Sequence, residues 1–431
     1  MANTSAIRLP LSRPVKDLEP TNRYDLTAPS DERQETLRDL LLTHHGAAAP
    51  LREPHLILHD HMPHILCSAL NLGQSSEVLK ETHDNIMETL VKIDHTFPRG
   101  EKIEKGRLRE YFKKREYTVA FMDFFDEEFR KENGDWKKVV HNYLFEQKPP
   151  LMNGLVGGLG HPMIHLAYAY DFECKEVASE GLSLLCTDYS DFHTLLDEPH
   201  PDTSTYKTTS LIEIFERVSQ DPRFDNLCEY PGAAEMEKVM QRGGAAIIEH
   251  WNAWEIKDPL LQLEQACDMA TLLAMSTYDD EQEFDFFLLH LMTSAHAMRS
   301  LWLHIPLDKQ VAMLREFAIL TVSTYVCQQR PPIRADSIEN VDVTGRDWNW
   351  VKKAAREHPA ATIDVHFYKA IRAPLGFEET WGDKDGWYLK AALLYLDKFK
   401  GWTGFGAGIP GFDEKQEGWS ARTGNGPAEK L

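Results

Sequence analysis

The sequence predicts an all-α fold, a single large multi-helix domain with an irregular segment at each end. Two observations lead to this expectation. Apolar residues recur with a period close to 3.6 along nearly all of the 431 residues. No internal repeat and no long low-complexity linker divides the chain. We therefore expect an irregular N-terminal strap over residues 1–32, an all-α domain over 33–403 and an irregular C-terminal tail over 404–431.

The first half of the chain has eight stretches of helical patterning. Asp31 and Asp60 are candidate N-caps, while Gly46 and Gly73 follow the last apolar residues of their stretches. The stretch from Asp31 could equally bind a partner, but a capped amphipathic surface helix explains it. The charged residues 99–112 fit a loop with a short helix. We expect helices over residues 31–46, 60–73, 76–93, 117–133, 136–145, 154–173, 176–185 and 210–218.

The second half has seven further stretches, and 279–303 is the most apolar of the long ones. Pro331 and Pro332 end the stretch before them. Residues 197–208 form a proline-containing loop, and 334–347 fit a loop with a short strand. We expect helices over residues 233–254, 259–278, 279–303, 307–328, 348–357, 363–371 and 385–399.

Charge and composition limit the classes of function. The net charge is −21, from 47 Lys and Arg against 68 Asp and Glu, so neither nucleic acid nor an anionic membrane is an expected partner. No apolar run approaches the roughly 20 residues that cross a bilayer, and the N-terminus lacks the apolar core of a secretory signal. Six scattered cysteines without a C-x-x-C pair indicate reduced thiols. We expect a cytoplasmic enzyme.

The chain has nineteen histidines, and their surroundings separate two groups. A histidine inside a long apolar helix needs a partner, because burying an unpaired polar ring costs about 1–3 kcal/mol. Eight histidines lie in polar or loop contexts instead, and we expect them at the surface. These are His44, His45, His83, His95, His141, His193, His200 and His358.

The stretch GLVGGLGHPMIHLAYAY, residues 154–170, carries His161 and His165 four positions apart. Pro162 suits the first turn of a helix, and on that helix both rings can point to one atom. The glycines before it allow a close approach of the backbone. The stretch is either a metal-binding helix or a helix start with His161 as cap and His165 as a hydrogen-bonded core residue.

Three other segments also offer inward-facing histidines. His61 and His64 lie three apart at the start of an apolar helix. In HLMTSAHAMRS, His296 shares a face with Met292, and Thr293 lies one turn before it. His290 is about 240° away on the same helix, so we assign it a structural role.

His366 and Lys369 are three apart in IDVHFYKAIRA, so both can point inward on one turn. This could be the polar edge of an ordinary helix. Alternatively, Lys369 lies in an apolar site that depresses its pKa, and the neutral amine acts as a base or forms a carbamate with carbon dioxide.

Imidazole-rich sites suit iron, copper or zinc. The zincin H-E-x-x-H, repeated Glu-x-x-His pairs and the G-x-S-x-G elbow are absent from the sequence. The glycines of residues 154–160 do not form the dinucleotide-binding G-x-G-x-x-G and follow no predicted strand. No flavin motif is present either. A metal site built from histidines is therefore the expectation that fits the sequence.

Four motifs together resemble the questin oxidase-like family of fungal aromatic polyketide pathways. They are HDHMPHILCSALNLG (59–73), NGLVGGLGHPMIHLAYAYDF (153–172), HLMTSAHAMRS (290–300) and DVHFYKAIRA (364–373), in that order. The resemblance implies an all-α oxygenase of secondary metabolism. Its substrates would be a planar anthraquinone-type aromatic, whose ring is opened, and molecular oxygen. One departure is Ile65, where the resemblance leads us to expect a second histidine.

The resemblance also implies a set of site residues around Fe(II). The implied ligands are His64, His165, His296 and His366, with Lys369 as a carboxylated ligand and His61 and His161 as alternative or outer residues. Thr293 would position water or dioxygen. Trp381, Trp387 and Phe405 are candidate walls of the substrate pocket, although core packing explains each as well.

Three other functions remain open from the sequence. The first is a Baeyer–Villiger-type oxidase on the same substrates, with NADPH as an external reductant. The second is a zinc hydrolase or lyase that uses the same histidines. The third is a non-enzymatic protein that binds a planar aromatic. The oligomeric state is not predicted by the sequence.

Overall fold

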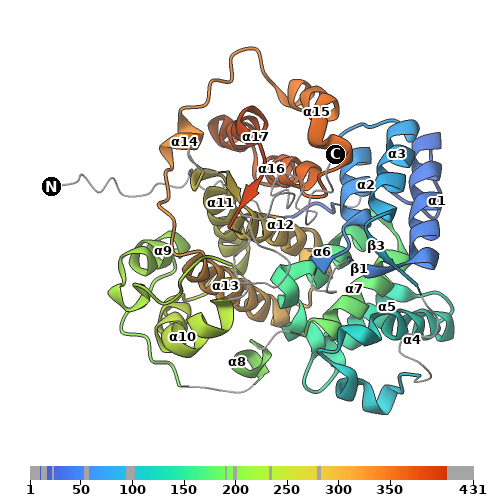
Figure 1. Cartoon of the computed structure of the whole chain (residues 1–431). Coiled ribbons are helices and arrows are strands. Elements are labelled where there is room, and N and C mark those ends of the chain that lie inside the picture. The colour runs from blue at the N-terminus through green and yellow to red at the C-terminus, as the bar shows by residue number, and fades with distance from the viewer. Residues whose placement is uncertain are drawn as a thin grey trace.

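The computed structural model describes residues 10, 17–21, 24–52, 58–93, 102–189, 192–197, 201–232, 235–278 and 283–404. Within these ranges the fold is helical with two small sheets, which confirms the predicted all-α class (Figure 1). The predicted strap is described only in part. The predicted tail lies outside the described residues apart from Gly404, and so does Phe405.

The α-helices of the described ranges are α1 (Glu32–Ala47), α2 (Met62–Asn71), α3 (Ser76–Met87), α4 (Thr118–Lys131), α5 (Trp136–His141), α6 (Gly157–Phe172), α7 (Lys175–Thr187), α8 (His193–Asp197), α9 (Leu211–Gln220), α10 (Met236–Ala253), α11 (Pro259–Ser276), α12 (Phe286–Leu301), α13 (Gln310–Cys327), α14 (Asp336–Glu339), α15 (Trp348–Glu357), α16 (Phe367–Trp381) and α17 (Trp387–Lys398). The strands are β1 (Ala48–Arg52), β2 (Leu58–His59), β3 (Leu90–Lys92), β4 (Phe284–Asp285) and β5 (Trp402–Thr403).

Most predicted helices are present, with differences at their ends. The predicted helix over 348–357 is confirmed by α15. The predicted helix over 76–93 is wrong at its end, because α3 stops at Met87 and the chain enters β3, which pairs with β1. The strand expected within 334–347 is also wrong, because this stretch contains the short helix α14. The helix expected over 363–371 begins only after His366 and runs through Pro374 to Trp381.

Each small sheet contains one pairing between segments that lie far apart in sequence, β1 with β3 and β4 with β5. The strands of the first have the order β2–β1–β3 and are antiparallel, with His59 opposite Leu51. The second pairs β4 with β5 in parallel, and Phe284 lies opposite Trp402. The first sheet therefore fixes His59 immediately before α2, and the second ties the end of the described chain to the start of α12.

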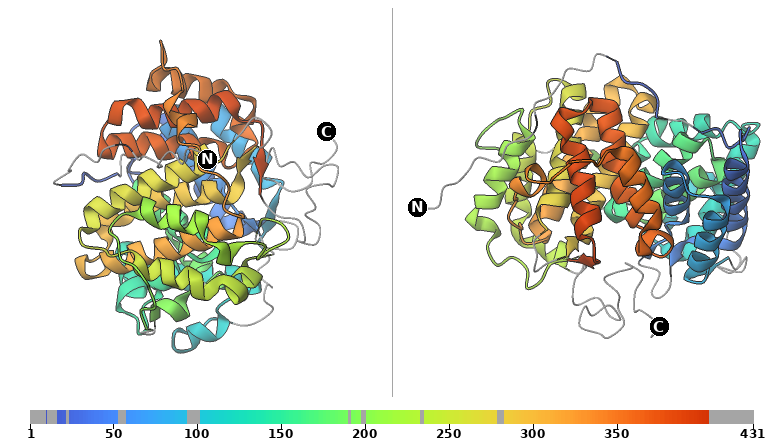
Figure 2. Two further views of the ribbon diagram at one scale, coloured as in Figure 1. Left: turned by 90° about the vertical axis from the view of Figure 1, so that its left-hand side faces the viewer. Right: turned by 90° about the horizontal axis from the view of Figure 1, so that it is seen from above.

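Helix α12 lies in the middle of the molecule, where it packs against α6, α11, α13 and α16 (Figure 1). Helices α1–α3 and helices α9 and α10 lie at opposite ends of the molecule (Figures 1 and 2). Nearly every residue of α12 is buried. The six cysteines are unbonded thiols, as predicted. Among the described helices, none combines the length and apolarity needed to cross a bilayer.

Part of the N-terminal segment is tied to three helices through one buried carboxylate. Asp171 at the end of α6 accepts hydrogen bonds from Thr21 Oγ1 at 2.5 Å and from Ser300 Oγ of α12 at 3.2 Å. It also forms an ion pair with Arg372 of α16. This cluster stabilises the mutual positions of α6, α12 and α16.

A second buried charge network corrects the placement of two histidines. His44 and His45 of α1 were expected at the surface, but their side chains are 0% and 13% exposed. His44 Nε2 lies 2.6 Å from Asp60, and His45 Nδ1 lies 2.9 Å from Glu180 of α7. His45 Nε2 also lies 3.1 Å from Asp126 of α4. The sequence around these histidines is polar, which led to the surface prediction. Their carboxylate partners lie on other segments, so the periodicity of α1 does not reveal them.

His45 gives the fold a pH-dependent stability that can be measured. Burial opposes its charge, but Asp126 and Glu180 raise its pKa to about 10. A pKa that is raised in the folded state stabilises below the unfolded value and loses that contribution as pH rises. We expect the free energy of unfolding to fall between pH 6.5 and about 10, by an amount on the order of a few kcal/mol. Urea unfolding at several pH values measures it.

The variant His45→Gln should be less stable at neutral pH and should lack most of this slope. His141→Gln is the matched control, because the His141 side chain is 46% exposed. A His45→Gln protein with the wild-type slope would contradict the role given to this network.

Candidate active site: a histidine cluster at the inner end of a cavity

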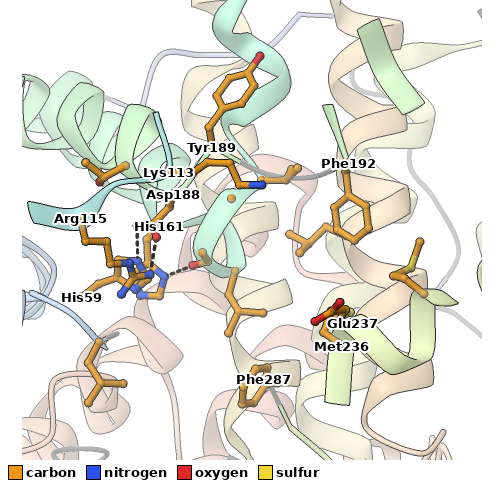
Figure 3. A pocket seen from close by; sticks show the side chains of 18 of the residues that line it. His59, Lys113, Arg115, His161, Asp188, Tyr189, Phe192, Met236, Glu237 and Phe287 are labelled. Atoms are coloured by element: carbon orange, nitrogen blue, oxygen red, sulfur yellow. Dashed lines mark hydrogen bonds and ion pairs between the residues drawn. The ribbon is translucent and has the colours of Figure 1, made fainter. Parts of the chain in front are cut away.

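A cavity of about 900 Å³ opens between α6, α7, α10 and the start of α12. Its walls are mostly apolar, and four polar side chains lie together on one side, namely His59, His161, Arg115 and Asp188 (Figure 3). Phe192, Met236 and Glu237 lie on the opposite side (Figure 3). The lining residues include Leu58, His59, His61, Lys113, Arg115, Val156, Gly157, Gly158, Leu159, His161, Asp188, Tyr189, Phe192, Met236, Met240, Phe286, Phe287 and Leu320.

The glycine-rich start of α6 brings backbone close to the polar side of the cavity. Gly158, Leu159 and Gly160 have positive φ angles of 50°, 58° and 82°, so regular helical geometry begins only at His161. A Cβ atom on Gly158 would lie 2.7 Å from His59 Nε2. The sequence predicted that the backbone approaches another group closely here, and in the structure the backbone of Gly158 packs against His59.

Two histidine pairs connect α2 with α6. The Nε2 atoms of His61 and His161 are 2.8 Å apart. His64 Nε2 lies 3.0 Å from His165 Nδ1, one turn further along both helices. His161 lines the cavity, whereas His64 and His165 are fully buried behind it. That His165 is the metal ligand of this helix stays a prediction. Of the two histidines on α6, His161 is the one that lines the cavity.

Hydrogen bonds fix the tautomers of three rings. His161 Nδ1 lies within hydrogen-bond distance of the Gly158 carbonyl and must donate to it, because a carbonyl only accepts. His161 Nε2 therefore accepts from His61 Nε2–H, which leaves a lone pair on His61 Nδ1. In the same way His290 Nδ1 donates to the Phe286 carbonyl at 2.6 Å, which leaves a lone pair on His290 Nε2.

These two lone pairs and His366 converge on one point. His61, His290 and His366 each offer a nitrogen, and the three nitrogens lie within 4.8 Å of one another. His61 Nδ1, His290 Nε2 and both nitrogens of His366 are buried without a hydrogen-bond partner. Three unsatisfied imidazoles around a common centre form a donor set that suits a metal ion, because hydrogen bonds at the remote nitrogens orient such ligands.

The choice of His296 over His290 as the inward-facing residue of α12 is wrong. His290 contacts His161 and His366, with ring centroids 4.9 Å from each. His296 faces another part of α16, where its ring blocks the space beside Gly376 and contacts Phe377. Because α12 is buried all around, apolar periodicity along it does not indicate which side carries the histidine cluster.

Thr293 and the predicted tryptophans lie elsewhere. The Thr293 hydroxyl donates to the His290 carbonyl of its own helix at 3.2 Å. Trp381 and Trp387 are buried in the core, and neither is among the residues that line the cavity. Core packing, the alternative given for both tryptophans, accounts for their positions.

The electrostatic environment keeps the cluster neutral. Burial lowers the pKa of His61, His290 and His366 well below its usual range, and nearby Lys369 adds to the effect. Burial also lowers the pKa of Lys369 itself, although Asp364 opposes this. The Lys369 amine is 2% exposed and has no hydrogen-bond partner. Neutral imidazoles and a neutral amine bind metal ions, whereas their protonated forms cannot.

A separate hydrogen-bonded group lies at the same end of the cavity. His59 Nε2 lies 2.7 Å from Asp188 Oδ2, and Arg115 forms an ion pair with the same carboxylate. Burial opposes ionisation of Asp188, but Arg115 and His59 lower its pKa to about 2. The ring of His59 stacks on that of His161, with centroids 4.0 Å apart. The sequence placed His59 near the other histidines but assigned it no role.

Comparison with known proteins identifies the family. The family model described as questin oxidase-like matches residues 58–374, which include all the histidines of the cluster. The chain belongs to the questin oxidase-like family.

Relatives of this questin oxidase-like chain carry the names of oxidases. It is 24% identical to Baeyer-Villiger oxidase mdpL of Emericella nidulans over 64% of this chain. The match spans 65% of the length of that relative, a little under two thirds. It is 23% identical to Baeyer-Villiger oxidase AgnL3 of Paecilomyces divaricatus, over 80% and 81%. It is also 23% identical to Questin oxidase of Aspergillus terreus, over 79% of each chain. Membership of this family places the chain among oxidoreductases.

The kink before His161 gives a testable prediction for this family member. Gly158→Ala should destabilise the protein more than Gly134→Ala. Both glycines have positive φ, which costs a side chain about 1–2 kcal/mol. Only at Gly158 does the new Cβ meet a neighbour, the His59 ring, because nothing lies within 4 Å at Gly134. Urea unfolding of the two variants measures the difference, and equal losses would show that the His59 contact is not tight.

Proposed function

We propose that this chain is a non-heme iron oxygenase of secondary metabolism that cleaves a ring carbon–carbon bond of an anthraquinone-type aromatic polyketide. The observation that carries the proposal is the convergence of three unpaired, neutral imidazoles beside a largely apolar cavity, which one of them, His61, also lines. Such cavities suit planar aromatic ligands. The names of the relatives support an oxidation in general, and the questin oxidase name supports the class of substrate.

In this proposal His61, His290 and His366 hold Fe(II), and Lys369 lies beside them as an amine or as a carbamate ligand. The ion, when bound, supplies the one-electron chemistry that lets dioxygen react with a closed-shell aromatic. The proposal keeps His366 and Lys369 from the predicted set and replaces His296 by His290. It also replaces His64 and His165 by His61, because the former two are hydrogen-bonded to each other behind the cavity.

The protein's own groups would bind and orient the substrate. Phe286 and Phe287 lie at the start of α12 and provide aromatic wall, and the backbone of Gly157 and Gly158 provides a wall without side chains. Apolar walls also exclude water from the reacting carbon atoms. The substrate is thereby held against the histidine end of the cavity.

The relatives' names favour a second candidate, oxygen insertion beside a ring carbonyl in the Baeyer–Villiger manner. That reaction places one atom of dioxygen in the product and reduces the other to water, so it consumes two electrons from a reductant such as NADPH. Dioxygenation places both atoms in the product and needs no net electron supply. Labelling with ¹⁸O₂ while NADPH consumption is followed distinguishes the two.

Metal content tests the proposed ligands. We expect His290→Ala and His366→Ala to lose most of the iron that the wild-type protein retains after anaerobic purification, because each removes one of three convergent donors. His296→Ala is the matched control on the same helix and should retain its iron. Elemental analysis of the purified proteins is the measurement.

Two outcomes would contradict the proposal. Full iron occupancy in His290→Ala and His366→Ala would exclude these residues as ligands. Zinc in place of iron, with activity that does not depend on oxygen, would favour a hydrolase or lyase that uses the same cluster.

A further inference from the structure

His59 is held at the cavity wall by four different contacts. Its backbone belongs to β2 and lies opposite Leu51 of β1. Its ring stacks on His161, and its Nε2 atom bonds to Asp188. The backbone of Gly158 packs against the ring, since a Cβ there would lie 2.7 Å from Nε2 and 2.8 Å from Cε1. The orientation of the ring is therefore fixed before any ligand enters.

These contacts also fix the position of the proton on the His59 ring. Asp188 is ionised beside Arg115, and a carboxylate only accepts hydrogen bonds, so His59 Nε2 carries the hydrogen. The charge of Asp188 is already balanced by Arg115, so the buried His59 ring need not carry a charge of its own. Its other nitrogen, Nδ1, is then a pure acceptor, and no hydrogen bond joins it to the described residues.

We propose that His59 selects substrates that carry a hydroxyl on the aromatic ring, because its Nδ1 accepts a hydrogen bond from that hydroxyl. This inference rests on the proposed function, in that it takes the cavity as the aromatic site. His59 is then a specificity-determining residue, whereas Asp188 and Arg115 are positioning residues that hold its tautomer. The hydrogen bond would also set which edge of the ring system lies nearest to His61.

His61 Nδ1 is a second acceptor at this end, but it belongs to the proposed metal site. Lys113 and Arg115 carry only donors, and Arg115 is bonded to Asp188. Glu237 lies across the cavity in an exposed position. His161 uses Nδ1 and Nε2 for Gly158 and His61. His59 thus offers a buried acceptor at the histidine end of the cavity. Its ring lies there against the ring of His161 (Figure 3).

The test compares two probes that differ only in the donor, 2-hydroxyanthraquinone and 2-methoxyanthraquinone. Their dissociation constants are measured by absorbance titration with the full-length protein in oxygen-free, mildly acidic buffer, so that the hydroxyl is neutral and no turnover occurs. The wild-type protein should prefer the hydroxyl probe by about 3- to 10-fold, the usual strength of one neutral hydrogen bond. His59→Phe keeps a ring against His161 but lacks the acceptor, so the preference should fall to about 1-fold.

Asp188→Asn is a second variant that does not alter the ring. Arg115 can only donate, so the amide oxygen should turn to Arg115 and the amide N–H to His59 Nε2. This moves the ring proton to Nδ1, which then donates to either probe equally, and the preference should again disappear. His141→Phe, a change at a half-exposed histidine of α5, should leave the preference intact.

The possible outcomes separate a specific role from a structural one. Loss of preference in both variants, with binding of the methoxy probe unchanged, supports the inference. A preference that persists in His59→Phe, or equal weakening of both probes, overturns it while leaving the proposed function standing. If neither probe binds the wild-type protein, the cavity is not an aromatic site, and both proposals fail.

Discussion

The centre of this molecule depends on one constraint, because six imidazole rings and one amine are buried there away from water. Each ring that is withdrawn from solvent must either find a hydrogen-bond partner or bind something from outside. His161 is satisfied internally, because its nitrogens bond to the Gly158 carbonyl and to His61. The other rings keep at least one unpaired nitrogen, and His61, His290 and His366 offer nitrogens that lie within 4.8 Å of one another. Burial keeps all of them uncharged, which makes coordination of a cation chemically favourable.

Charges outside this centre are neutralised in pairs, and these pairs position the helices that carry the cluster. Asp171 holds α6, α12 and α16 together through Thr21, Ser300 and Arg372. The carboxylates around His44 and His45 tie α1 to α4 and α7 and to the turn before α2. Both sets place full charges in the interior, but each charge has an opposite partner. The central cluster differs from both sets, because its imidazoles are uncharged and lie beside the cavity.

Much of the fold could be predicted from the sequence, but the site only in part. Periodicity identified long helices such as α11, and the motifs brought together the segments that carry His61, His161 and His366. The predicted ligands, however, were His64, His165, His296 and His366, whereas His61, His290 and His366 are the histidines that converge. The side of α12 that faces the cluster could not be predicted, because a helix that is buried all around has no polar face to orient it. The strands are two to five residues long and depend on partners distant in sequence, so no local pattern predicts them.

The cavity has two ends with different tolerance for change. At the histidine end the groups are locked by a sheet, a ring stack and backbone contacts, so most substitutions there would disturb several neighbours at once. The opposite wall includes Met236 and Met240 on α10, and methionine adapts its shape at little cost. A chain built in this way can evolve new selectivity by repacking one helix while its reactive end stays unchanged. Divergence among relatives with only 21–24% identity would then concentrate on α10, leaving the helices that carry the histidines comparatively constant.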